Sequence, residues 1–163
     1  MALFSSIGKS IEGQIERHII VPWPLAYGCC RIEIENTMSA TYDWQRLGVG
    51  RLVEKPHQAD TLIVSGWINE ALAEEIKAVY AQLAAPRSVI AVGACMLSGS
   101  PYATSPKKAL TISELIPVDV FVPGCPPRPE AILEAFNMLK QIRNPMKNQD
   151  KVIYAALRGP SGA

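Results

Sequence analysis

Apolar residues recur every four positions near the start of the chain. The stripe consists of Leu3, Ile7, Ile11, Ile15 and Ile19. Ser, Gly, Lys, Glu and Gln lie between them, and this spacing places the apolar residues along one side of a helix. The pattern predicts an amphipathic helix within residues 1–20, packed on its own domain or docked on a neighbouring subunit or membrane surface. We expect Val21-Pro-Trp-Pro-Leu25 to be a connector, since proline lacks an amide donor and ends the helix.

Further along, short apolar runs alternate with longer amphipathic stretches. Residues 61–65, 88–93 and 118–122 are rich in β-branched residues, which is typical of buried strands. Residues 69–83 and 129–143 have helical spacing. Apolar strands separated by helices indicate a parallel sheet that is covered on both faces. The predicted class is therefore α/β: a flavodoxin-like, doubly wound, mainly parallel sheet with helices on both faces.

Size and composition indicate one domain whose surface is partly covered by partners. The 163 residues are enough for one core, which we place at residues 21–143, followed by a polar tail over residues 144–163. Charged residues make up 19%, below the roughly 25% typical of soluble domains. A net charge of +1 does not indicate the basic surface that nucleic-acid binding requires. We see neither a membrane-spanning stretch nor a secretion signal, and so expect a reducing compartment.

Four cysteines carry the candidate chemistry: Cys29, Cys30, Cys95 and Cys125. In a reducing compartment they indicate metal ligands or reactive thiols rather than disulfides. Cys95 and Cys125 follow predicted strands, at the edge where doubly wound sheets hold their functional crevice. Cys29 and Cys30 are adjacent, so both can reach one centre only if the backbone turns sharply, and Gly28 permits such a turn.

The number and spacing of the cysteines favour an iron–sulfur centre. Structural zinc sites usually contain CxxC pairs, which this chain lacks, whereas a [4Fe-4S] cluster takes four cysteine ligands. We predict that all four hold one [4Fe-4S] cluster, with a zinc-binding structural subunit and a flavodoxin-like flavin carrier as alternatives. Arg31 and Arg128 lie within three residues of a ligand and are candidate neighbours of this anionic group. For Arg46 and His57 we expect solvated surface positions.

Several motifs together resemble a known family. They are Trp23-Pro24, Gly28-Cys-Cys-Arg-Ile-Glu33, Tyr42-Asp43, Arg46-Leu-Gly-Val49, Gln58-Ala-Asp60, Gly93-Ala-Cys95 and Val118-Asp-Val-Phe-Val-Pro-Gly-Cys-Pro-Pro-Arg-Pro-Glu-Ala131. Over roughly residues 20–140 the chain resembles the 20 kDa iron–sulfur subunit of respiratory complex I, a family shared with the small subunits of membrane-bound [NiFe] hydrogenases.

The resemblance implies an electron-transfer subunit that is not active alone. Its place would be the peripheral arm of an ion-pumping oxidoreductase of the NADH or ferredoxin:quinone type, at the cytoplasmic face of the cell membrane. The implied partners are a large catalytic subunit, a ferredoxin-like iron–sulfur subunit and membrane subunits. Glu33, Tyr42 and Asp43 are candidate catalytic residues near the cluster or the substrate. Each has an ordinary alternative. Glu33 would be a structural carboxylate that pairs with Arg31 or an amide, and Tyr42 and Asp43 would be polar residues of an exposed loop without a catalytic role.

The motifs point to two branches of this family. The adjacent Cys29 and Cys30 resemble complex I, whereas residues 93–99 and 125–132 resemble the hydrogenases. Glu35 and Asn36 interrupt the apolar run that follows the tandem cysteines in complex I, where quinone approaches. The alternatives to a quinone reductase are therefore the small subunit of a group 4 membrane-bound [NiFe] hydrogenase and a hydrogenase-related sulfur-reducing complex.

Overall fold

A single parallel sheet organises the computed structural model, which describes residues 19–99 and 110–143. The described strands have the order β1–β2–β3–β4. They are β1 (Pro22–Ala26), β2 (Thr61–Ser65), β3 (Ser88–Val92) and β4 (Val120–Val122). In the register, Thr61 pairs with both Pro22 and Ser88, and Ile90 pairs with Val120. Because every ladder is parallel, all four strands end at the same edge of the sheet.

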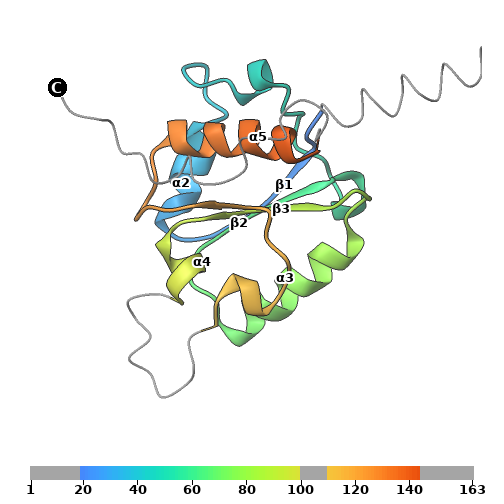
Figure 1. The fold of residues 1–163 in the computed structure, drawn as a ribbon, viewed down its shortest axis with the longest axis vertical. Helices are drawn as coiled ribbons and strands as arrows, with labels where there is room; N and C mark the ends of the chain where they lie inside the picture. The colour runs from blue at the N-terminus through green and yellow to red at the C-terminus, as the bar shows by residue number, and fades with distance from the viewer. Residues whose placement is uncertain (1–18, 100–109, 144–163) are drawn as a thin grey trace, which may run out of the picture.

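Helices cover both faces of this sheet (Figure 1). On one face lie α2 (Cys29–Asn36) and α5 (Pro129–Arg143), and on the other α3 (Glu70–Gln82) and α4 (Ala94–Ser98). Short 3-10 turns are η1 (Trp44–Leu47), η2 (Pro56–Gln58) and η3 (Ile112–Glu114). The predicted α/β class, with a parallel sheet covered on both faces, is confirmed.

Each face of the sheet has its own apolar core. Beneath α5, the rings of Trp44 and Phe136 meet edge to face at 5.6 Å between centroids, beside the strand residues Ile63 and Ile90. On the opposite face, the strand residues Leu62 and Val64 pack with α3 and α4. Every residue of β2 and β3 is buried, which explains why these two strands are continuous apolar runs without alternation.

The expected connector at residues 21–25 is instead the edge strand β1. The prediction was wrong because proline excludes a strand only where its missing amide would be needed. Val21 O accepts from Thr61 N at 3.2 Å, and Tyr27 N donates to Ser65 O at 3.2 Å, so the odd-numbered residues face β2. Pro22 and Pro24 therefore face away from β2, at the side where the edge strand has no partner in the described sheet.

The two ends of the chain fall mostly outside the described residues. This applies to the predicted helix over residues 1–20, of which residues 1–18 lie outside, and to the tail over residues 144–163. Ile20 forms an isolated parallel bridge with Val49. Among the helices that are described, none is both long and apolar enough to cross a membrane.

A buried ion pair fastens α5 to the amino-terminal edge of the sheet. Arg143 Nη2 lies 2.9 Å from Asp60 Oδ1, and their side chains are 6% and 16% exposed. Arg143 also donates to the hydroxyls of Thr61 at 2.8 Å and Ser88 at 3.0 Å. Asp60 Oδ1 in turn accepts from Val21 N at 3.2 Å. The network joins α5 to the starts of three strands.

Candidate metal centre

Three chain segments bring the four cysteines to one edge of the sheet. Cys29 and Cys30 follow β1, Cys95 follows β3, and Cys125 follows β4. Because the strands are parallel, these segments leave the sheet at the same edge, which is the usual place of functional sites in α/β folds. All four cysteines are free thiols in the structure.

The tandem cysteines form the start of helix α2. Gly28 caps the helix with φ 67°, a conformation that glycine adopts without strain, and Arg31 N closes the turn onto Gly28 O at 3.3 Å. The sharp turn expected at Gly28 is thus present. It leaves Cys30 buried at 4% exposure and Cys29 exposed.

Gly93 leaves room for the sulfur of Cys30. A Cβ atom at Gly93 would lie 2.6 Å from Cys30 Sγ, and the residue has φ 97°. The neighbouring backbone joins the segments of Cys95 and Cys125, because Gly93 N donates to Val122 O at 2.8 Å and Ala94 N donates to Gly124 O at 2.7 Å. The sequence contained no signal for the role of Gly93, which depends on a contact with a distant segment.

The four thiols influence one another electrostatically. Burial, followed by the charge and hydrogen bond of Cys29 and the charges of Cys95 and Cys125, raises the pKa of the Cys30 thiol to about 12. The metal-free protein therefore keeps a proton on this sulfur at neutral pH. A metal that binds Cys30 must displace that proton, and the positive charge of the metal would reverse the repulsion among the thiolates.

The arrangement of the donors suits a centre larger than one ion. In the described part of the chain, no three His, Cys, Asp or Glu side chains form a group that could hold a single metal ion. A tetrahedral zinc site would require sulfurs about 3.8 Å apart, given Zn–S distances of about 2.3 Å. In a [4Fe-4S] cluster each thiolate binds a different iron. Four thiols from three segments at one edge of the sheet match the number of ligands that such a cluster takes.

The basic residues predicted near the cysteines lie at the surface. Arg31 Nε lies 2.6 Å from Glu35 Oε1, in a pair whose side chains are about half exposed or more. Arg31 thus pairs with Glu35 rather than with Glu33. Arg128, Arg46 and His57 are exposed. For Arg46 and His57 this agrees with the solvated surface positions that we expected.

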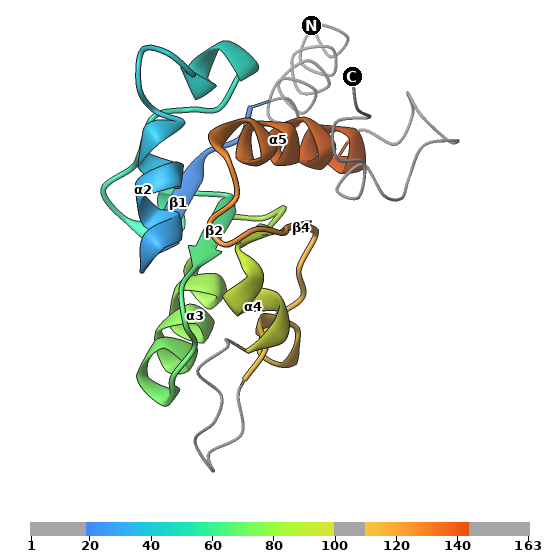
Figure 2. The same cartoon turned by 90° about the vertical axis from the view of Figure 1, so that its left-hand side faces the viewer.

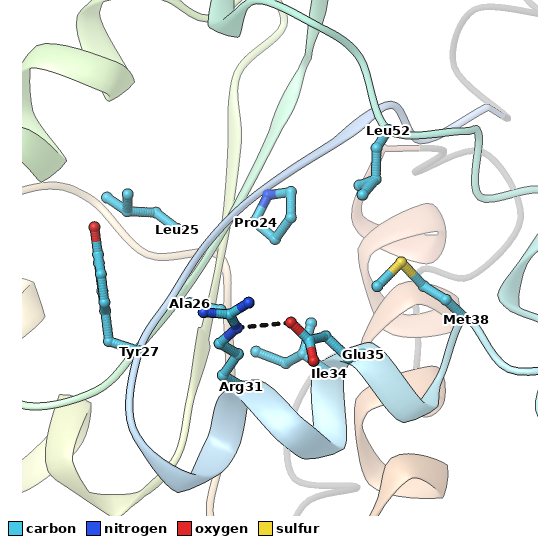
Figure 3. A pocket seen from close by; sticks show the side chains of 9 residues that line it. All are labelled: Pro24, Leu25, Ala26, Tyr27, Arg31, Ile34, Glu35, Met38 and Leu52. Atoms are coloured by element: carbon cyan, nitrogen blue, oxygen red, sulfur yellow. Dashed lines mark hydrogen bonds and ion pairs between the residues drawn. The ribbon is translucent and has the colours of Figure 1, made fainter.

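A groove runs between β1 and α2, next to the tandem cysteines. Its volume is about 320 Å3. Figure 3 shows the Arg31–Glu35 pair facing the groove from α2, with Pro24, Leu25 and Ala26 of β1 opposite. Tyr27, Ile34, Met38 and Leu52 complete the lining. The groove thus combines apolar walls with one exposed ion pair.

The three candidate catalytic residues lie along α2 and the turn that follows it. Glu33 is half-buried in α2. Tyr42 Oη donates to Glu130 Oε1 at 3.2 Å. Asp43 has φ 40° and is the one non-glycine residue with positive φ in the described ranges. This contact with Glu130 was not predicted, although Glu130 lies in the Pro-Arg-Pro-Glu motif that carries the family resemblance.

Large apolar side chains are exposed around the same edge of the sheet. Ile32 is 67% exposed, Trp67 50%, Tyr27 43% and Leu97 41%. They lie in the segments that follow β1, β2 and β3, two of which also carry Cys29, Cys30 and Cys95; we call these four residues the apolar rim. Exposed apolar patches of this kind mark interaction surfaces.

Known proteins share this sequence and fold. Residues 28–139 match the family described as the 20 kDa subunit of NADH ubiquinone oxidoreductase. An NADH-quinone oxidoreductase subunit from Heliobacterium modesticaldum is 43% identical, over 77% of this chain and 73% of that protein. The NADH-quinone oxidoreductase subunit of the same type from Clostridium beijerinckii is 39% identical, over 82% and 88%.

Solved structures resemble the fold as well. A chain of the membrane-bound sulfane sulfur reductase, an archaeal respiratory membrane complex, superposes with a TM-score of 0.73 and 26% identity, over 84% of this chain and 77% of that one. A chain of an NAD+-reducing [NiFe]-hydrogenase reaches a TM-score of 0.57 at 19% identity, over 86% and 98%, and shares the fold.

Proposed function

This chain belongs to the family of the 20 kDa subunit of NADH-ubiquinone oxidoreductase, and we propose that it carries one [4Fe-4S] cluster on Cys29, Cys30, Cys95 and Cys125. The observation that carries the proposal is the convergence of four free thiols at one edge of a parallel sheet. When bound, the cluster supplies reversible one-electron transfer. The chain is accordingly an electron-transfer subunit of an oxidoreductase complex, as its relatives are.

The chain's own residues hold the cluster and limit its contact with water. Cys30 would anchor it from the buried side, where Gly93 leaves space for the sulfur. Cys29 and Cys125 are exposed, so the cluster would face outward between them, toward the apolar rim. A partner seated on the rim would exclude water from this side, and burial is one of the factors that set a reduction potential.

We propose that the partner on the apolar rim is a large catalytic subunit. The wider assembly would be the peripheral arm of a complex I-like, ion-pumping membrane oxidoreductase, with a ferredoxin-like iron–sulfur subunit and membrane subunits as further partners. The location would be the cytoplasmic face of the membrane. The names of the relatives support quinone as the acceptor.

A sulfur compound is the second candidate acceptor. The groove beside α2 carries the exposed Arg31–Glu35 pair, which would be costly to cover with a lipophilic quinone. The chain also resembles the sulfane sulfur reductase at 26% identity. The two candidates are separated by supplying the purified complex with a quinone analogue or with polysulfide, since the true acceptor sustains turnover and the other does not.

The cluster itself is tested on the anaerobically purified full-length chain. We expect a brown protein with about four iron atoms per chain and broad absorbance near 400 nm. Cys95→Ala and Cys125→Ala should each abolish the intact cluster and its EPR signal after reduction. Stoichiometric zinc without iron, or an EPR signal unchanged in both variants, would refute the proposal.

A further inference from the structure

One hydrogen bond links the turn after α2 to the first turn of α5. Tyr42 Oη donates to Glu130 Oε1 at 3.2 Å, although the residues are 88 positions apart. Tyr42 lies in the turn after α2, and Glu130 lies in the first turn of α5. The bond therefore joins the segment that follows Cys29 and Cys30 to the helix that follows Cys125.

The segment that carries Cys125 leads directly into α5. Cys125 lies between β4 and α5, and Glu130 is the second residue of α5. Figure 2 shows the chain that leads from β4 into α5 passing beside α2. The bond from Tyr42 therefore reaches α5 five residues after Cys125.

The backbone after α2 directs Tyr42 toward this partner. Trp44 is 2% exposed and packs on Phe136 of α5, which fixes the chain on one side of Tyr42. The chain turns at Asp43, which has a left-handed conformation. Asp43 N donates to Ser39 O at 2.8 Å within this turn. A non-glycine residue in this region is strained, so packing around Trp44 must maintain the turn.

The groups around Tyr42 keep its phenol protonated, so that its hydroxyl can donate a hydrogen bond. The hydrogen bond to Glu130 is the main cause that raises the pKa of Tyr42, with smaller contributions from burial and from the charges of Glu130 and Glu33, while Arg128 acts in the opposite direction. The phenol therefore keeps its proton. The bond fixes where the turn after α2 lies relative to the first turn of α5.

We propose that Tyr42 and Glu130 are positioning residues, whose hydrogen bond holds the Cys29–Cys30 segment against the Cys125 segment. This inference rests on the proposed cluster. The two segments also share an apolar core, but without the bond the start of α5 would be held less firmly against the turn after α2. Cys125, five residues before Glu130, would then exchange on and off its iron more often. The cluster would then lose iron faster and become less uniform in its surroundings.

The test compares variants of the full-length, cluster-loaded chain under anaerobic conditions. We measure the rate of iron transfer to a chelator and the EPR line shape after reduction. Tyr42→Phe should accelerate iron loss about two- to tenfold, the factor that one ordinary hydrogen bond allows, and should broaden the EPR signal. Glu130→Gln keeps an acceptor and should retain near-normal rates, whereas Glu130→Ala should behave like Tyr42→Phe.

Two comparisons make the result specific. Glu134→Gln removes the same charge one turn further along α5, where Glu134 accepts from Asn137 at 3.1 Å, and should leave both readouts unchanged. Combining Tyr42→Phe with Glu130→Ala should add little to either single change, because both remove one interaction. Denaturation midpoints of the metal-free variants should match the wild type, which separates positioning from a general loss of stability.

The outcomes also separate this inference from the proposed function. If the wild-type chain holds no iron, the cluster itself is wrong and the positioning role falls with it. If the wild type holds iron but Tyr42→Phe releases it at the wild-type rate with an unchanged EPR signal, the positioning role alone is wrong. Additive effects of the two changes would likewise overturn it.

Discussion

At Gly93 the site depends on the absence of a side chain. A Cβ atom there would approach Cys30 Sγ to 2.6 Å, and the residue has φ 97°. Real Cβ atoms are not found at such a distance, and Cys30 is too buried to move aside easily. The lack of a side chain at Gly93 therefore helps to determine where the sulfur of Cys30 lies.

Gly93→Ala should remove most of the bound iron from the purified chain. The methyl group displaces Cys30 Sγ, and the backbone conformation, with φ 97° and ψ 155°, adds about 1–3 kcal/mol of strain for a residue with a side chain. Iron per chain and absorbance near 400 nm measure the effect. Gly48→Ala is the control, because Gly48 also has positive φ, at 70°, but lies in the turn after η1 rather than beside a cysteine. Equal iron content in the two variants would contradict a specific role for Gly93.

At the scale of elements, the Arg143–Asp60 pair holds α5 against the starts of the strands. The pair is largely buried, and Arg143 contacts three polar residues at once. Removing one member of such a pair leaves the other charge without its partner in a poorly solvated place, which is more costly than the loss of a surface pair.

Arg143→Met should lower the free energy of unfolding by about 3–5 kcal/mol, a large share of the roughly 5–15 kcal/mol typical of a domain. Urea denaturation of the metal-free chain measures this change. Lys77→Met removes a pair with Glu74 at 3.1 Å whose side chains are both exposed, and should cost about 0.5 kcal/mol or less. Similar losses in the two variants would show that the Arg143 pair is no stronger than a surface pair.

The longer helices and the buried strand β2 could be predicted from the sequence, whereas α2 and β1 could not. The predicted bounds of β2 are those observed, and α3 and α5 agree to within one residue, because their apolar periods are long or uninterrupted. The short helix α2 was not predicted, since its eight residues mix tandem cysteines with Arg31, Glu33 and Glu35. β1 was missed because the effect of Pro22 and Pro24 depends on which side of the strand has a partner.

For the site, the four cysteines were predictable, but the contacts that arrange them were not. Cysteine type and number are visible in the sequence. The closeness of Gly93 to Cys30, and of Tyr42 to Glu130, arises only when distant segments fold onto the same edge. Gly93 and Glu130 lie within the motifs that carry the family resemblance, but those motifs do not say which distant residues they contact.

At the scale of the whole molecule, the apolar rim gives this chain one face suited to a partner. Ile32 and Trp67 are its most exposed members and follow two neighbouring strands. Aromatic and aliphatic side chains at the centre of an interface usually carry most of the binding free energy. The rim and the exposed cysteines lie at the same edge, so one partner would cover both.

Replacing Ile32 and Trp67 with serine should weaken binding of the large subunit at least about tenfold without changing the iron content. Binding of the two purified subunits and iron per chain are the measurements. Ile142→Ser is the matched control, because Ile142 is also exposed, at 44%, but lies next to Arg143 at the opposite edge of the sheet. A larger loss of binding in Ile142→Ser would place the interface elsewhere.

The order of the cysteines along the chain has a consequence for biosynthesis. Cys29 and Cys30 leave the ribosome early, whereas Cys125 follows β4, the last strand of the described sheet. A nascent chain can therefore pair its first strands before Cys125 is translated. Under the proposed function, the cluster could be completed only after nearly the whole domain has been translated, and a chain truncated before residue 125 would lack one of the four proposed ligands.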